Sequence, residues 1–151
     1  MKQFNSIDDI LDFAIEMEQK SIEFYNELAQ KSKTDDMKTT FYNFVEEEIK
    51  HKAKLIKIKE EKTFTLGQEK INELNIADYL EKNEPHENMS YQEALILAMN
   101  REKAAFRLYT KLANQTSNPE FVKLFLSLAQ EESKHKLMFE IEYDEVILKE
   151  N

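Results

Sequence analysis

The sequence contains no cysteine and has only one glycine and two prolines in 151 residues. Without cysteine, the chain has no disulfide, no thiolate metal site and no thiol-based catalytic centre. Because helix-breaking residues are so few, long helices are favoured over short strands joined by tight turns. No apolar run reaches the roughly 18 residues of a membrane span, and the N-terminus lacks the pattern of a signal peptide. We therefore expect a soluble, cytoplasmic, helical protein.

Basic residues are outnumbered as well: 21 Lys and Arg stand against 30 Asp and Glu, for a net charge of -9. This balance argues against binding to nucleic acid and to anionic membranes, because both attract basic surfaces. The 41% hydrophobic and 34% charged residues suit amphipathic helices. A chain of this length is most simply one domain, which we place over residues 1–151.

Apolar residues recur at helical spacing in four segments. The first helix is expected over about 7–32, after a cap at Ser6, and a short polar turn separates it from the second. The pattern then weakens over 62–90, where we expect a crossover with a short helix near 76–82 and a turn at 83–85. A connection of this length can travel along a bundle and reverse the usual up-down order of its helices.

The third and fourth helices have clear start signals. Ser90 and Glu93 form a capping-box pattern before the third helix, whose expected apolar stripe includes Phe106. Pro119 is suited to the first turn of the fourth helix, which we expect to end in the charged tail after Tyr143. The four segments predict an all-α fold, a four-helix bundle with a long crossover between its second and third helices.

Glutamate and histidine residues interrupt all four apolar stripes. The second and fourth helices each contain one Glu-x-x-His, and 30 residues before each of these glutamates stands another glutamate. The set repeats at an offset of 84, with Glu18, Glu48 and His51 in the first half and Glu102, Glu132 and His135 in the second. Because residues three apart share one side of a helix, each Glu and His of a pair can hold one ion between them.

The two halves of the chain also match more widely. When residues 14–56 are laid over 98–140 without a gap, eleven positions are identical. We interpret this as an internal duplication of a helical hairpin, with repeats at about 7–61 and 91–145 and the crossover at about 62–90. Two such hairpins can pack about a pseudo-two-fold axis, which would bring the two Glu and His sets together in the core.

Four glutamates that converge inside a bundle imply a metal. Their charges would repel one another, and removing each from water without a partner costs several kcal/mol. Two divalent cations would neutralise the four charges, and carboxylate with imidazole suits iron or manganese, with zinc as a further occupant. One Glu from each of two helices and a Glu-x-x-His from each of the others is a known di-iron or di-manganese arrangement.

These motifs resemble those of ferritin-like proteins, most closely the rubrerythrin family, over nearly the whole chain. The residues that carry the resemblance are Glu18 with Tyr25, Glu48 with His51, Glu102 with Tyr109, and Glu132 with His135. The resemblance implies that Glu48 and Glu132 bridge two iron ions. It implies that the remaining ligands are Glu18, His51, Glu102 and His135, and that the reduced pair reacts with peroxide or dioxygen.

Two features depart from the rubrerythrin pattern. Rubrerythrins carry a rubredoxin-like domain with iron-binding cysteines, and this chain has no cysteine, so we expect electrons to come from a separate protein. Rubrerythrins also have a further Glu one turn after the third-helix ligand, where this chain has Ala105. We therefore expect a more symmetric centre, nearer to that of bacterioferritin.

Other polar residues lie near the six candidate ligands in the sequence. Tyr25 and Tyr109 follow Glu residues by seven positions, on the same helix face, where they either hydrogen-bond to ligands or relay electrons, or only pack in the core. Glu47 and Glu131 are rotated about 100° off the stripes, so we expect surface carboxylates that metal binding does not need. The third histidine, His86, is expected to be exposed.

The sequence leaves two functions open. The first is a di-iron oxidoreductase that reduces peroxide or uses dioxygen to oxidise ferrous iron, and the alternative is an iron-handling protein with little turnover. A helical scaffold without metal is a third hypothesis. We expect a two-fold homodimer, in which the identical hairpins pair within or between chains.

Overall fold

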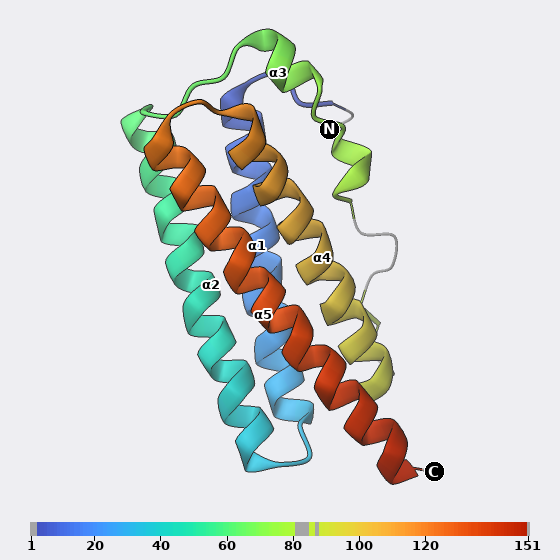
Figure 1. Ribbon diagram of the computed structural model, residues 1–151. Helices are drawn as coiled ribbons and strands as arrows, with labels where there is room; N and C mark the ends of the chain where they lie inside the picture. The colour runs from blue at the N-terminus through green and yellow to red at the C-terminus, as the bar shows by residue number, and fades with distance from the viewer. Residues whose placement is uncertain (1–2, 81–84, 87, 151) are drawn as a thin grey trace.

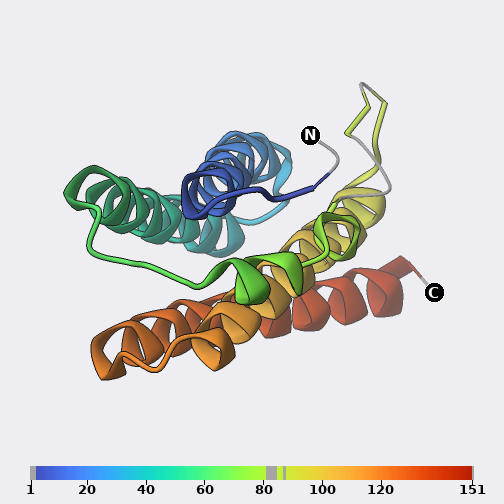
Figure 2. The ribbon, with the colours of Figure 1, turned by 90° about the horizontal axis from the view of Figure 1, so that it is seen from above.

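The computed structural model describes residues 3–80, 85–86 and 88–150, and its described part is all-helical. Four long helices are α1 (Ile7–Lys31), α2 (Asp35–Glu61), α4 (Tyr91–Gln115) and α5 (Pro119–Glu150), and between α2 and α4 lie the short helix α3 (Gln68–Asn72) and the 3-10 turn η1 (Ile76–Asp78). The long helices run side by side (Figure 1), and the view from above shows a layer of α1 and α2 against a layer of α4 and α5 (Figure 2). The expected ferritin-like helical bundle is confirmed.

The helix ends follow from local sequence. The hydroxyls of Ser6, Thr34 and Ser90 each accept a hydrogen bond from the backbone N–H three residues later, at 3.1–3.2 Å, which caps α1, α2 and α4. Pro119 begins α5, where its missing N–H leaves no bond unmade. Lys62, with φ of 54°, ends α2 in the left-handed conformation.

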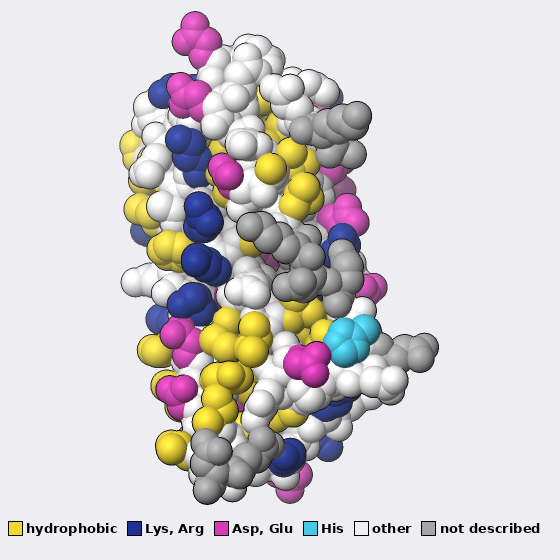
Figure 3. All heavy atoms as spheres, turned by 90° about the vertical axis from the view of Figure 1, so that its right-hand side faces the viewer, with side chains coloured by type: hydrophobic (Ala, Val, Ile, Leu, Met, Phe, Trp, Pro, Cys, Tyr) yellow, Lys and Arg dark blue, Asp and Glu magenta, His cyan; other side chains and the backbone are white. Residues whose placement is uncertain are grey.

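The expected features at the start of α4 are present, and one residue farther along the helix differs. The expected capping box is present: the Glu93 N–H donates to the Ser90 hydroxyl, and the Glu93 carboxylate accepts from the Ser90 backbone. The same carboxylate also contacts His86, with 3.0 Å between Oε2 and Nε2. His86 is 55% exposed, as predicted, and Figure 3 shows a histidine at the surface on this side of the molecule. Phe106 does not belong to the buried stripe of α4, because its side chain is 39% exposed.

The crossover was predicted only in part. Where a short helix near 76–82 was predicted, the described residues form the three-residue 3-10 helix η1, which is shorter than expected, and residues 81–82 lie outside the described part of the chain. The short helix α3 was not predicted. Five residues are too few for a helical period to show in a sequence. The turn at 83–85 lies mostly outside the described residues. Buried apolar side chains fasten the crossover to one end of the bundle, and they are Phe64, Ile71, Leu74, Ile76 and Tyr79.

The core has two hydrophobic clusters, one toward each end of the bundle. The cluster beneath the crossover includes Leu11, Leu55, Leu112 and Phe125, and the other includes Leu28, Phe41, Leu95 and Phe139. Each long helix contributes to both clusters, and the candidate ligands stand between the two contributions on every helix. The polar residues thus form a layer between two apolar regions that exclude water.

Candidate metal centre

The six glutamates and histidines that interrupt the apolar stripes converge in this layer. Each is only about 1% exposed, and they are Glu18 of α1, Glu48 and His51 of α2, Glu102 of α4, and Glu132 and His135 of α5. They form two groups whose potential ligand atoms lie within 4.8 Å of one another, Glu18, Glu48, His51 and Glu132 in one and Glu48, Glu102, Glu132 and His135 in the other. Because both groups contain Glu48 and Glu132, these two carboxylates occupy the shared position between two potential ion sites.

The inward imidazole nitrogens lie among carboxylate oxygens. His51 Nδ1 is 2.8 Å from Glu132 Oε1 and 3.5 Å from Glu48 Oε1. His135 Nδ1 is 3.3 Å from Glu48 Oε1 and 3.6 Å from Glu102 Oε1. The short contacts from each histidine to a bridging glutamate join α2 to α5, so they exist only because the two hairpins pack together.

Each of the six side chains presents one buried atom that has no hydrogen-bond partner among the described residues. These atoms are Glu18 Oε2, Glu48 Oε1, His51 Nδ1, Glu102 Oε2, Glu132 Oε1 and His135 Nδ1. A buried polar atom without a partner costs roughly 1–3 kcal/mol, so six in one place call for a common ligand. Oxygen and imidazole donors with several negative charges fit divalent transition metals, and the residues present therefore fit the metal centre that their types predict.

The outer nitrogen of each imidazole meets a glutamate from the other hairpin. His51 Nε2 contacts Glu131 Oε2, and His135 Nε2 contacts Glu47 Oε2. Because a carboxylate only accepts, the Nε2–H donates, so Nδ1 is the nitrogen that faces the centre and that can bind a metal ion once it has lost its proton. Glu47 and Glu131 are 44% and 38% exposed, so the predicted surface carboxylates are also partners of the candidate ligands. The presence of glutamate at this position in both copies of the repeat was the sequence signal for this role, which helix register alone did not predict.

Two buried tyrosines hold the remaining carboxylates. Tyr25 donates its hydroxyl hydrogen to Glu102 Oε1, and Tyr109 donates to Glu18 Oε1. Both tyrosines are 0% exposed, and each bond again joins one hairpin to the other. Of the two alternatives for these residues, the hydrogen bond to a candidate ligand is present, and it fixes which oxygen of each glutamate stays directed at the centre.

Burial and mutual repulsion dominate the electrostatics of the shared glutamates. Burial, followed by the charges of Glu18 and Glu102, raises the pKa of Glu48 well above its ordinary value. Burial and the charge of Glu102 likewise raise the pKa of Glu132. In Glu102, burial also favours the neutral form, but polar interactions with Glu132 and His135 outweigh it and lower the pKa. Without metal, protons on the two shared carboxyls relieve the repulsion.

The pKa values of both histidines are raised, although burial by itself would lower them. Burial lowers the pKa of His135, but the close carboxylates of Glu102 and Glu48 outweigh it and raise the pKa to about 11. The pKa of His51 is raised for the same kind of reason, chiefly through Glu18 and Glu131. A divalent ion would therefore replace protons that the metal-free centre holds at neutral pH.

The two halves of the centre are not identical. The ring of Phe44 stacks on His135, with centroids 4.0 Å apart and planes at 27°, whereas the repeat places Leu128 at the equivalent position of the other half. Ala105, one turn after Glu102, is buried and adds no carboxylate. The side chains that contact the candidate ligands are thus symmetric in polar contacts and asymmetric in apolar packing.

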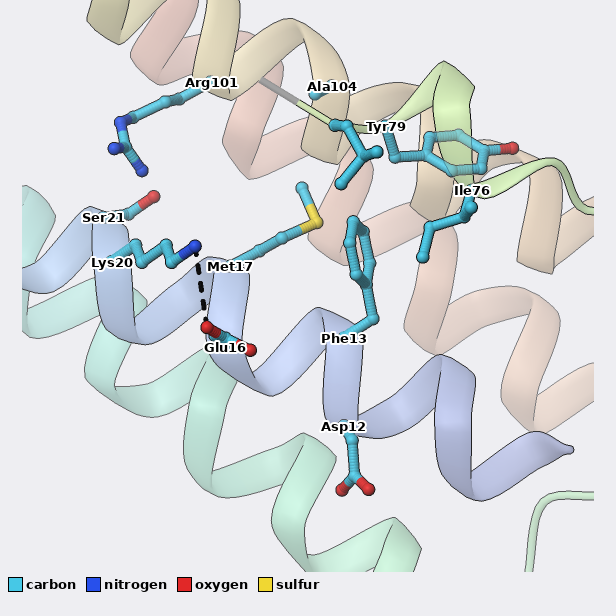
Figure 4. A pocket seen from close by; sticks show the side chains of 11 residues that line it. Asp12, Phe13, Glu16, Met17, Lys20, Ser21, Ile76, Tyr79, Arg101 and Ala104 are labelled. Atoms are coloured by element: carbon cyan, nitrogen blue, oxygen red, sulfur yellow. Dashed lines mark ion pairs between the residues drawn. The ribbon is translucent and has the colours of Figure 1, made fainter. Parts of the chain in front are cut away.

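A cavity of about 280 Å³ lies between α1, α4 and the segment around η1 (Figure 4). Apolar side chains such as Phe13 and Tyr79 line one end, and Arg101 lies at the other. Glu16 and Lys20 form an ion pair of 3.5 Å at its edge. None of the six converging residues lines this cavity, so it is separate from the candidate metal centre.

The fold and the donor set together define a ferritin-like bundle with a buried carboxylate and histidine cluster that can hold metal ions. A family model described as Rubrerythrin matches residues 9–143, and the chain belongs to the rubrerythrin family. Comparison with curated proteins found no match, and comparison with solved structures found none either. Within the described residues, no helix is long and apolar enough to cross a membrane.

Proposed function

We propose that the protein is a di-iron oxidoreductase that reduces peroxide or uses dioxygen to oxidise ferrous iron, with electrons from a separate donor protein. The observation that carries this proposal is the set of six inward atoms without hydrogen-bond partners, arranged in two groups that share Glu48 and Glu132. A single-ion site would not need two overlapping groups. Such chemistry would suit a role in defence against oxidative stress.

In this proposal Glu48 and Glu132, which belong to both groups, would be shared by two ions. Glu18 and His51 would complete the ligands of one ion, and Glu102 and His135 those of the other. Manganese or zinc can occupy the same donors. When bound, two ferrous ions supply the two electrons that peroxide reduction requires and polarise the O–O bond.

The residues around the ligands position them and limit access of water. Glu47 and Glu131 hold the imidazole rings with Nδ1 inward, while Tyr25 and Tyr109 hold one oxygen each of Glu102 and Glu18. Both tyrosines have pKa values well above the ordinary value, because of burial and then the nearby carboxylates. They therefore stay protonated at neutral pH and act as hydrogen-bond donors throughout.

The test is an anaerobic ferrous titration followed by peroxide or oxygen. We expect two ferrous ions per chain, rapid oxidation on mixing, and repeated turnover when a reductant is supplied. His86→Ala is the matched control, because it removes the one exposed histidine and leaves both buried ones. Binding of well below one ion per chain, unchanged by anaerobic loading, would contradict the di-metal proposal.

The alternative function is iron handling with little turnover. Ala105 favours it, because this position lacks the additional carboxylate that resemblance to rubrerythrins associates with redox-linked movement of iron. Kinetics separate the two functions. A single slow oxidation without repeated turnover, in protein that binds two ferrous ions, would support iron handling over catalysis.

A further inference from the structure

The outward face of α5 carries a stripe of exposed apolar side chains. Of nine large hydrophobic residues exposed in the described part of the chain, four lie on this helix, namely Leu126 (48%), Leu137 (58%), Ile141 (45%) and Leu148 (74%). In Figure 1, α5 lies at the front of the bundle, and no described element covers it. The stripe points away from Glu132 and His135, which are buried on the opposite side of the same helix.

The stripe follows the period of the helix. At 100° per residue, its four members fall within an arc of roughly 60°, and 22 residues from Leu126 to Leu148 extend roughly 33 Å. Three polar residues, Gln130, Ser133 and Asp144, occupy the positions between the apolar ones, and all three are exposed. These four apolar and three polar residues together form a seam along α5, and the order of residue types along the seam determines what can pack on it.

The seam is complementary to itself when a second copy runs antiparallel. Residues at equal distances before and after Leu137 then face one another. The resulting layers are Leu126 with Leu148, Gln130 with Asp144, Ser133 with Ile141, and Leu137 with itself. Two kinds of layer match chemically, since leucine meets leucine and an amide meets a carboxylate, whereas the small Ser133 and the branched Ile141 match in size only.

Charges beside the seam agree with the antiparallel direction. Lys136 and Glu140 form an ion pair of 2.8 Å on one flank, where Lys136 stands one residue before Leu137 and Glu140 three residues after it, an axial mismatch of about 3 Å in an antiparallel pair. An antiparallel copy would therefore bring Lys136 near Glu140 of the other chain. In a parallel arrangement Asp144 would face Asp144, which disfavours that direction.

We propose that this face of α5 is the interface of a two-fold homodimer, in which the two α5 helices pack antiparallel about an axis at Leu137. A net charge of -9 makes two copies repel, so the match of opposite charges along the seam matters for association. The interface would brace the segment of α5 whose inner side carries Glu132 and His135. It does not depend on metal or on the proposed function.

Cysteine cross-linking tests the axis directly, because the chain has no cysteine of its own. Leu137→Cys places one thiol at the two-fold axis, and mild oxidation should convert most of the protein into a disulfide-linked dimer. Ile49→Cys is the matched control, since Ile49 is 49% exposed on α2 and lies off the seam. Equal cross-linking of the two variants would overturn the proposal.

Mass in solution tests the interface without cross-linking. Wild-type protein should have about twice the monomer mass of 18.0 kDa, and Leu137→Glu should return it to the monomer mass with unchanged helicity. Lys136→Glu should weaken the dimer, and the double exchange Lys136→Glu with Glu140→Lys should restore it.

A monomeric wild type would overturn the proposal. A dimer that Leu137→Glu leaves intact would overturn it too, and this is the result expected if hairpins exchange between chains. If Leu137→Glu fails to fold, the cross-linking comparison decides.

Discussion

His51 on α2 and Glu131 on α5 contact each other across the boundary between the two hairpins, and the duplicated half repeats the contact between His135 and Glu47. In each pair, the carboxylate takes the outer N–H of the imidazole and leaves the inner nitrogen free for a metal ion. His51 belongs to one of the two groups of potential ligands, and His135 belongs to the other. The two pairs link metal binding to the packing of one hairpin on the other.

The first prediction concerns these outer glutamates. Glu47→Ala should weaken metal binding by about 10–100-fold, because His135 loses the carboxylate that orients its ring. Metal affinity measured by competition with a chelator checks this. Glu46→Ala is the control, since Glu46 is the adjacent exposed carboxylate. Equal affinity in the two variants would show that the imidazole keeps its orientation without the contact.

The second prediction separates shared from unshared ligands. Glu132→Ala should abolish binding of both ions, because this residue belongs to both groups of potential ligands. Glu18→Ala should remove one ion, because Glu18 belongs to only one group. Metal content after anaerobic ferrous loading distinguishes the two results. Loss of the same number of ions in both variants would contradict the bridging role of Glu132.

The third prediction concerns the tyrosine hydrogen bonds. Tyr109→Phe should lower the free energy of unfolding of the metal-free protein by about 1–3 kcal/mol, because a buried oxygen of Glu18 loses its donor. Denaturant unfolding measures the change. Tyr42→Phe, at a position that is 40% exposed, should change stability little. The prediction is wrong if the two substitutions have the same effect.

The fourth prediction is a pH dependence of the metal-free protein. The charges of Glu102 and Glu48 outweigh burial and raise the pKa of His135 from 6.5 to about 11, so the folded protein holds this proton more tightly than the unfolded chain. The stabilisation is fully present below about pH 6.5 and is lost as the pH rises toward about 11.

His135→Gln isolates this effect. The difference in unfolding free energy between wild type and variant should shrink as the pH rises, and metal-loaded wild type should not show the decline, because metal replaces the proton. Thermal or denaturant unfolding at several pH values provides the measurement. A difference that stays constant across this range would mean that His135 is neutral in the metal-free protein.

Most of the fold and the six converging residues could be predicted from local pattern. The period of 3.6 residues placed Glu18 and Glu102 on apolar stripes, and the repeat at an offset of 84 paired His51 with His135. Helix start signals such as Ser6 and Pro119 act on backbone groups close to them in the chain, so they too could be recognised in the sequence. The short segments of the crossover were not, because a few residues do not show a period.

Only the tertiary structure decided which side chains meet across the hairpins. Helix register placed Glu47 and Glu131 off the buried stripe and predicted surface residues, yet each contacts a histidine of the opposite hairpin. The reason is that periodicity describes the direction of a side chain within its own helix, whereas these contacts depend on how closely and at what height the second hairpin packs. The sequence by itself determined the donor atoms of the candidate metal centre, and the packing of the two hairpins decided what holds those atoms in place.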